Sequence, residues 1–183
     1  MFFKHLIVFQ PDLLIIGINP GGDFNDGIPF LEREINWYTK GEKHSFNETL
    51  CKVFGYGKND KLFDLLDNAV GTNMVFFNTG SVKKLKENKL NGEMRSKCVK
   101  IVRNLVDNFI QAKRILCLGV PPFYEMKNTS QIEYPIKGVR KSYRGNIPVY
   151  YIPNPSQLRI NQDYKLEQIT QYQNYFEREF LKP

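Results

Sequence analysis

Apolar residues along this 183-residue chain gather in short runs, separated by longer segments with helical spacing. Gly, Pro or Asn bounds each run, which favours buried strands over buried helices. The predicted strands are Leu13–Ile18, Met74–Phe77, Ile115–Val120 and Pro148–Ile152. Strands that alternate with helices predict an α/β fold, here a three-layer α/β/α domain with a central, mostly parallel four-stranded sheet.

The segments outside these strands place apolar residues on single helix faces. A helix is also expected to begin at Ser45, a possible N-cap with Glu48 three residues later. The predicted buried faces consist of Leu62, Leu65, Leu66 and Ala69; of Met94, Cys98, Ile101, Leu105 and Phe109; and of Leu166, Ile169, Tyr172, Phe176 and Phe180.

Composition narrows the class of protein. With 42% hydrophobic and 25% charged residues, the chain is expected to form one globular domain over residues 1–183. The apolar start, MFFKHLIVFQPD, is too short to span a membrane and is interrupted by Lys4 and His5. It has no small-residue cleavage site, so we expect neither a signal peptide nor a membrane partner.

The cysteines and histidines offer little for metal chemistry. Cys51, Cys98 and Cys117 have no CxxC spacing, and an odd count favours a reduced, intracellular (cytoplasmic, nucleoid-associated or nuclear) protein. Three thiols are too few for a four-thiolate iron–sulfur cluster, and His5 and His44 are the only histidines. We therefore expect no metal and no organic cofactor.

The formal net charge is +7, with an isoelectric point near 9.2. A basic chain favours a polyanion such as nucleic acid as its partner, although many basic proteins bind none. Most Lys and Arg residues are dispersed, apart from Lys83–Lys86 and the RKSYR run at Arg140–Arg144.

Two loops rich in Asn, Pro and Gly follow predicted strands. In a parallel sheet, ligands bind beyond the carboxyl ends of the strands, so the loops Gly17–Phe30 and Pro153–Asn161 are expected to face one edge. The first loop fits neither the P-loop nor the GxGxxG pattern, which disfavours a phosphate cradle. An ordinary turn begun by Pro20 and Gly21 explains it equally well. In the second loop, Leu158 either enters the core or forms a wedge between bases.

Two short motifs then point to a family. GINPG at Gly17–Gly21 and NPSQL at Asn154–Leu158 resemble the signature motifs of the uracil-DNA glycosylase superfamily. The closest resemblance is to its mismatch-specific branch, the bacterial mismatch uracil and eukaryotic thymine-DNA glycosylases. The single-strand-selective branch is the runner-up, since it has a similar first motif and GIPF at Gly27–Phe30 matches a segment that both branches have. That branch has His where Asn154 stands, which favours the mismatch branch. Gln157 departs from the Gly of the mismatch branch, which leaves specificity for mismatched pairs open.

The resemblance implies a monofunctional DNA glycosylase of base excision repair that acts as a monomer on DNA containing uracil or a related lesion. In the family, the first-motif asparagine positions the attacking water, which places Asn19 in the catalytic pair with Asn154. The implied substrate-binding residues are Gly17, Ile18, Pro20, Gly21, Phe30 and Ser156, with Phe30 stacking on the base. The implied DNA-binding residues are Gln157, Leu158 and Arg159, with Leu158 filling the gap in the base stack and Arg159 holding a phosphate.

Other interpretations remain open. Phe30 is as often a core aromatic as a stacking platform, and Arg159 is more often solvated than bound to phosphate. Asn78, after the second strand, is a further candidate pocket residue. The chain could also be a catalytically silent member that binds nucleic acid or a protein. A small-molecule enzyme acting on a nucleoside or nucleotide is the third hypothesis.

Overall fold

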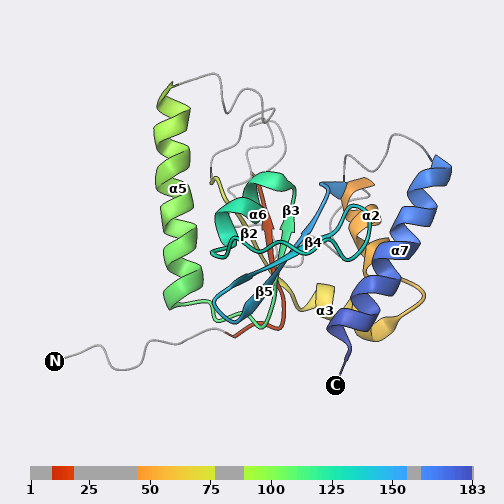
Figure 1. Cartoon of the computed structure of the whole chain (residues 1–183). Helices are drawn as coiled ribbons and strands as arrows, with labels where there is room; N and C mark the ends of the chain where they lie inside the picture. Colours follow the sequence, from red (N-terminus) through yellow and green to blue (C-terminus); the bar gives the residue numbers. More distant parts are fainter. Residues whose placement is uncertain (1–9, 19–44, 77–88, 156–161, 183) are drawn as a thin grey trace.

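The computed structural model describes residues 10–18, 45–76, 89–155 and 162–182 (Figure 1). Within these ranges the elements in chain order are β1 (Leu14–Gly17), α2 (Ser45–Val53), α3 (Asp60–Asp67), β2 (Val70–Asn73), α5 (Lys89–Asn108), β3 (Ile115–Leu118), α6 (Val120–Met126), β4 (Arg140–Arg144), β5 (Ile147–Ile152) and α7 (Gln162–Phe180). The predicted helix start at Ser45 is confirmed.

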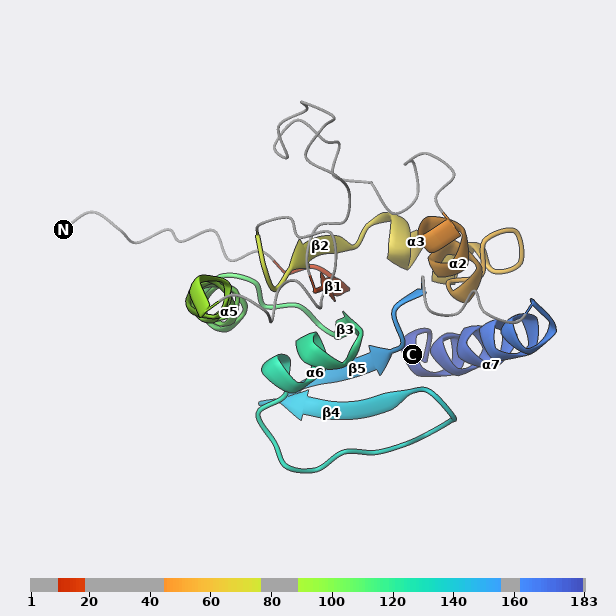
Figure 2. The same cartoon turned by 90° about the horizontal axis from the view of Figure 1, so that it is seen from above.

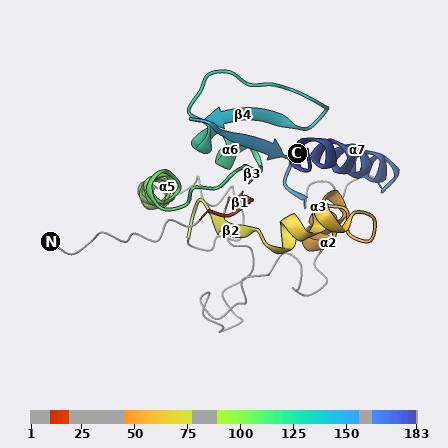
Figure 3. The ribbon, with the colours of Figure 1, turned by 90° about the horizontal axis from the view of Figure 1, so that it is seen from below.

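The strands form one five-stranded sheet in the order β2-β1-β3-β5-β4. β1 pairs in parallel with β2 and β3, β3 pairs in parallel with β5, and β4 lies antiparallel to β5 at the edge (Figure 3). The α/β class and the mostly parallel sheet are confirmed, whereas the predicted count of four strands is wrong. β4 has no apolar run that would predict a strand, because an edge strand need not be apolar. Its sequence is RKSYR, and only Ser142 is buried.

The second strand begins earlier than predicted. The apolar run suggested Met74–Phe77, but β2 spans Val70–Asn73 and pairs with β1 from Leu14↔Val70 onward. Backbone bonds continue past it, since the amides of Met74 and Val75 donate to the carbonyls of Gly17 and Ile18. β2 is the other edge of the described sheet, so its Gly, Thr and Asn residues were not recognisable as a strand.

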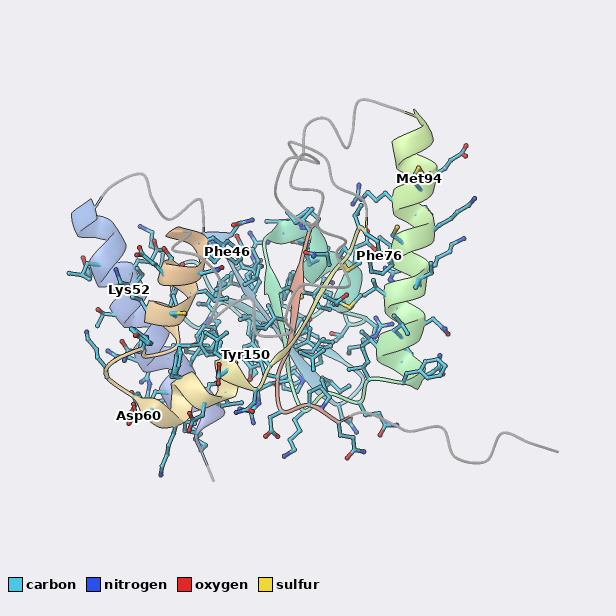
Figure 4. The ribbon with its side chains drawn as sticks, turned by 180° about the vertical axis from the view of Figure 1, so that it is seen from behind. Phe46, Lys52, Asp60, Phe76, Met94 and Tyr150 are labelled. Atoms are coloured by element: carbon cyan, nitrogen blue, oxygen red, sulfur yellow. The ribbon has the colours of Figure 1, made fainter. Side chains whose placement is uncertain are left out.

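Successive residues of β1 supply two separate cores, because side chains alternate across a strand. Leu13 and Ile15 pack with α2, α3 and α7 on one face, and Leu14 and Ile16 pack with α5 and α6 on the other. Figure 2 shows these two groups of helices on opposite sides of the sheet, so the described residues form three layers. Tyr150, labelled in Figure 4, lies on the α7 side of the sheet.

One helix presents a different face to the sheet from the one predicted. In α5 the buried residues are Val99, Val102 and Val106, whereas Met94 and Ile101 are 40% and 50% exposed. Phe109, just after α5, is also exposed, and Cys98 and Leu105 are intermediate. Both faces of α5 carry apolar residues at helical spacing, so periodicity alone could not choose between them.

The other two predicted helix faces are largely confirmed. Leu62, Leu66 and Ala69 are buried, with Leu65 packed against the same core. In α7 the predicted face is buried from Ile169 to Phe180, but Leu166 is 64% exposed. Among the described helices, none combines the length and the apolar character needed to cross a membrane.

Candidate functional site at the carboxyl edge of the sheet

The structure describes the first residues of each of the two motifs. Gly17, Ile18 and Asn154 are described. The other predicted site residues lie outside the described ranges: Asn19, Pro20, Gly21, Phe30, Asn78, Ser156, Gln157, Leu158 and Arg159. The geometry of the site can therefore be followed up to the point where the first motif leaves β1 and the second leaves β5.

Those two exits lie at the same edge of the sheet. β1 and β5 both run parallel to β3 and flank it on either side. The amide of Gly119, just after β3, donates to the carbonyl of Ile152 at the end of β5 (2.9 Å). Two strand spacings put the ends of β1 and β5 about 10 Å apart. Loops that start this close can line a single site between them.

Gly17 allows a polar side chain of β2 to approach the backbone of the first motif. Asn73 is the register partner of Gly17, and a Cβ on Gly17 would stand 2.5 Å from Asn73 Oδ1. With a larger residue at this position, the end of the Asn73 side chain would have to shift. The sequence does not mark Asn73 as a strand residue, because the apolar run begins only after it, at Met74.

On the other side of β1, the glycine that follows β3, Gly119, leaves room for the side chain of Ile18. Its backbone has φ +103°, which residues with a side chain rarely adopt, and a Cβ there would stand 3.3 Å from Ile18 Cδ1. The Ile18 side chain thus reaches the end of β3. Ile18 is also held through its carbonyl, which accepts from the Val75 amide (3.0 Å). Ile18 is therefore held by its backbone carbonyl on the β2 side and approaches the end of β3 with its side chain.

The exit from β5 is stiffened by prolines. Pro153 and Asn154 are half-buried and Pro155 is buried, so Asn154 stands between two residues of restricted φ. Nearby, Phe76 beyond β2 and Val120 at the start of α6 remain 47% and 41% exposed. Figure 4 shows Phe76 at the end of β2. The described part of the edge thus combines amide side chains with exposed apolar surface.

Among the described residues at the carboxyl ends of β1, β2, β3 and β5 (17–18, 73–76, 118–121 and 152–155), none carries an ionisable side chain. Cys117 lies one residue deeper in β3, is fully buried, and burial raises the pKa of its thiol. A neutral buried thiol is a poor nucleophile. Amides, by contrast, can orient a water and hydrogen-bond a base, but cannot take up a proton near neutral pH.

Two surface depressions of the described residues are lined by no residue of this edge. One is lined by residues of α3 and α7, including Lys61 and Arg178. The other lies between α5 and α6, where Glu125 forms salt bridges with Arg95 and Arg103. Over the same ranges, no group of three or more His, Cys, Asp and Glu side chains could hold a metal ion.

No protein-family model matches the chain, and no curated protein matches it.

Proposed function

We propose that this chain is a monofunctional DNA glycosylase that hydrolyses the N-glycosidic bond of uracil or a related damaged base. One observation supports the proposal most: β1 and β5, whose ends lead into GINPG and NPSQL, flank β3 at a single edge. Loops after parallel strands share an edge in any case, and the specific feature here is that β3 alone separates the two strands. A pocket that takes an extruded nucleotide needs walls from more than one loop.

The proposed reaction requires little acid–base chemistry from the protein. The bond between C1′ of the deoxyribose and the base nitrogen breaks, and its electron pair leaves with the base. Water adds its oxygen to C1′, and the base ends protonated. Fixed hydrogen-bond donors stabilise the leaving base while its negative charge develops. An edge rich in amides is suited to these tasks.

Each motif residue then has a proposed role. Asn19 orients the water, Phe30 stacks on the extruded base, and the backbone near Ile18 contacts its edge. Asn154 and Ser156 shape the pocket beside the sugar. Asn73 is a further candidate contact, since its amide lies against Gly17. Gln157, Leu158 and Arg159 contact the DNA: Leu158 fills the gap in the base stack, and Arg159 holds a phosphate.

The proposed enzyme works as an intracellular monomer without a metal or organic cofactor. Its substrate preference is less defined than its reaction, because Gln157 replaces the glycine of the resembled branch. A side chain there either supplies a new contact to the opposite base or blocks the one that the glycine backbone makes.

A substrate panel tests the proposal. Duplexes with deoxyuridine opposite guanine or adenine, and a single strand with deoxyuridine, are incubated with the protein, and abasic sites are cleaved with alkali. The expected result is strand cleavage on at least one uracil substrate and none on matched thymidine controls. Absence of base release at high enzyme excess would contradict the proposal.

The rival function is a catalytically silent glycosylase-like protein that binds nucleic acid. Gln157 and the positive net charge are compatible with it. Salt-sensitive DNA binding without any base release would favour the rival. Release of uracil from free deoxyuridine but not from DNA would instead favour a small-molecule enzyme.

A further inference from the structure

The guanidinium of Arg140 lies among three tyrosine rings on the α5–α6 face of the sheet. Its Cζ is 4.8 Å from the ring centroid of Tyr151, 5.9 Å from that of Tyr124 and 6.0 Å from that of Tyr134. The Nη1 atom also donates to the hydroxyl of Tyr124 (3.3 Å). These distances are within the range of cation–π attraction. We call these four residues the Tyr–Arg cluster.

Part of this cluster is anchored and part is exposed. Tyr151 is buried, and its ring packs against Phe123 at 5.9 Å. Tyr134 and Tyr124 are 68% and 47% exposed. Aromatic rings usually bury most of their surface, so two exposed rings around one cation call for a partner.

The charge of Arg140 is not neutralised by a carboxylate of the described residues, unlike that of its neighbours. Arg144 pairs with Asp107 (2.6 Å), Lys141 with Glu179 (2.9 Å) and Arg103 with Glu125 (2.7 Å). Lys127 adds a second cation, with its ammonium 5.6 Å from the ring centroid of Tyr124. Positive charge therefore accumulates where the exposed rings lie.

The cluster lies at the same edge as the candidate site. Arg140 is the register partner of Tyr151, which immediately precedes Ile152, the last residue of β5. Tyr124 belongs to α6, which begins directly after Gly119. Figure 2 shows α6 next to β5 and β4. The rings and the cation thus stand beside the strand end that leads to Asn154.

We propose that the Tyr–Arg cluster is a stacking platform for unpaired nucleotides of a DNA strand, next to the nucleotide held at the candidate site. Every base has a π-face, so exposed tyrosines bind unpaired bases without sequence preference. Arg140 and Lys127 contribute to phosphate attraction along the strand. This inference rests on the proposed glycosylase function for its choice of DNA, but the platform itself can be tested without catalysis.

The first test measures binding of a labelled oligothymidylate that contains no uracil, by fluorescence anisotropy. Tyr134→Ser and Tyr124→Ser are expected to raise Kd at least roughly fivefold each, whereas Tyr→Phe at either position retains affinity. Arg140→Gln is expected to reduce the slope of log affinity against log salt by about 0.7. The matched controls are Tyr56→Ser, a tyrosine between α2 and α3 that is about as exposed as Tyr134, and Arg178→Gln on α7.

A second probe separates stacking from charge. An abasic strand of the same length carries the phosphates without the bases. The wild type is expected to bind it more weakly than oligothymidylate, and the two Tyr→Ser variants are expected to lose that difference. Equal binding of both strands by the wild type, or equal losses in the Tyr56→Ser control, would overturn the platform.

Failure of the platform and failure of the proposed function are distinguishable. Uracil excision with no effect of Tyr124→Ser or Tyr134→Ser on binding overturns the platform and leaves the glycosylase proposal intact. Tyrosine-dependent binding of the uracil-free strand without excision supports the platform and contradicts the glycosylase. Tighter binding of the matching ribo-oligonucleotide than of the DNA strand would overturn the assignment to DNA.

Discussion

The side-chain amide of Asn73 lies against the Cα of Gly17, across the pairing of β2 with β1. Gly17 is the first residue of the GINPG motif, so this contact connects the motif to the neighbouring strand. A methyl group on Gly17 would stand 2.5 Å from Asn73 Oδ1, and the amide would have to move. The relationship explains why a glycine ends β1.

Gly17→Ala should therefore destabilise the fold by about 1 kcal/mol or less, because only the end of the Asn73 side chain has to shift. In the double variant with Asn73→Ala, much of this loss should disappear, because the obstructing amide is gone. Denaturant unfolding of the two single variants and the double variant measures the coupling. An equal effect of Gly17→Ala with and without Asn73 would contradict the contact.

Gly119→Ala should cost about 1–3 kcal/mol, because φ +103° is unfavourable for alanine and its Cβ would meet Ile18. Gly145→Ala is the matched control, since Gly145 also has positive φ but nothing within 4 Å of a Cβ. Thermal unfolding should show the larger loss at Gly119. Adding Ile18→Ala should reduce the excess at Gly119, and no such reduction would argue against the contact.

The two faces of α5 should respond differently to truncation. Val102→Ala removes buried methyl groups from the core against the sheet and should cost at least about 1 kcal/mol. Ile101→Ala, one residue away on the exposed face, should change stability by about 0.5 kcal/mol or less. Urea unfolding of the two variants measures the contrast. A larger loss at Ile101 would show that the originally predicted face is the buried one.

The central strands of the sheet can be predicted from the sequence, whereas its edge strands cannot. The largely buried strands β1, β3 and β5 are recognisable, because central parallel strands are apolar on both faces. Edge strands β2 and β4 are not, since residues such as Thr72 and Arg140 need not be buried. The convergence of Gly17 and Ile152 at one edge followed from the parallel direction of their strands. The amide of Asn73 did not, because only the register brings it beside Gly17.

The stability of the fold should fall at alkaline pH. Burial raises the pKa of the Cys117 thiol, so the folded state keeps a proton that the unfolded chain loses above its ordinary pKa of about 8.5. Protons are then bound more tightly by the folded state, and the free energy of unfolding falls as pH rises, by up to about 1.4 kcal/mol per pH unit for one group.

Cys117→Ala should flatten this dependence between about pH 8.5 and pH 9.5, where ordinary tyrosines are still mostly protonated. Urea unfolding across that range measures the slope for the wild type and for the variant. The wild type and Cys98→Ala, a half-buried control, should keep the steeper slope. Equal slopes in all three proteins would contradict the assignment to Cys117.

The most direct test of the proposed function is the single-turnover rate of uracil release by Asn19 variants on the best substrate of the panel. An amide can only orient the water, whereas a carboxylate can also accept its proton. We predict that Asn19→Ala lowers the rate by at least about a hundredfold, and that Asn19→Asp releases uracil at least as fast as the wild type. Asn174→Ala, on the exposed surface of α7, should leave the rate unchanged. Release that persists undiminished in Asn19→Ala would contradict the role of Asn19.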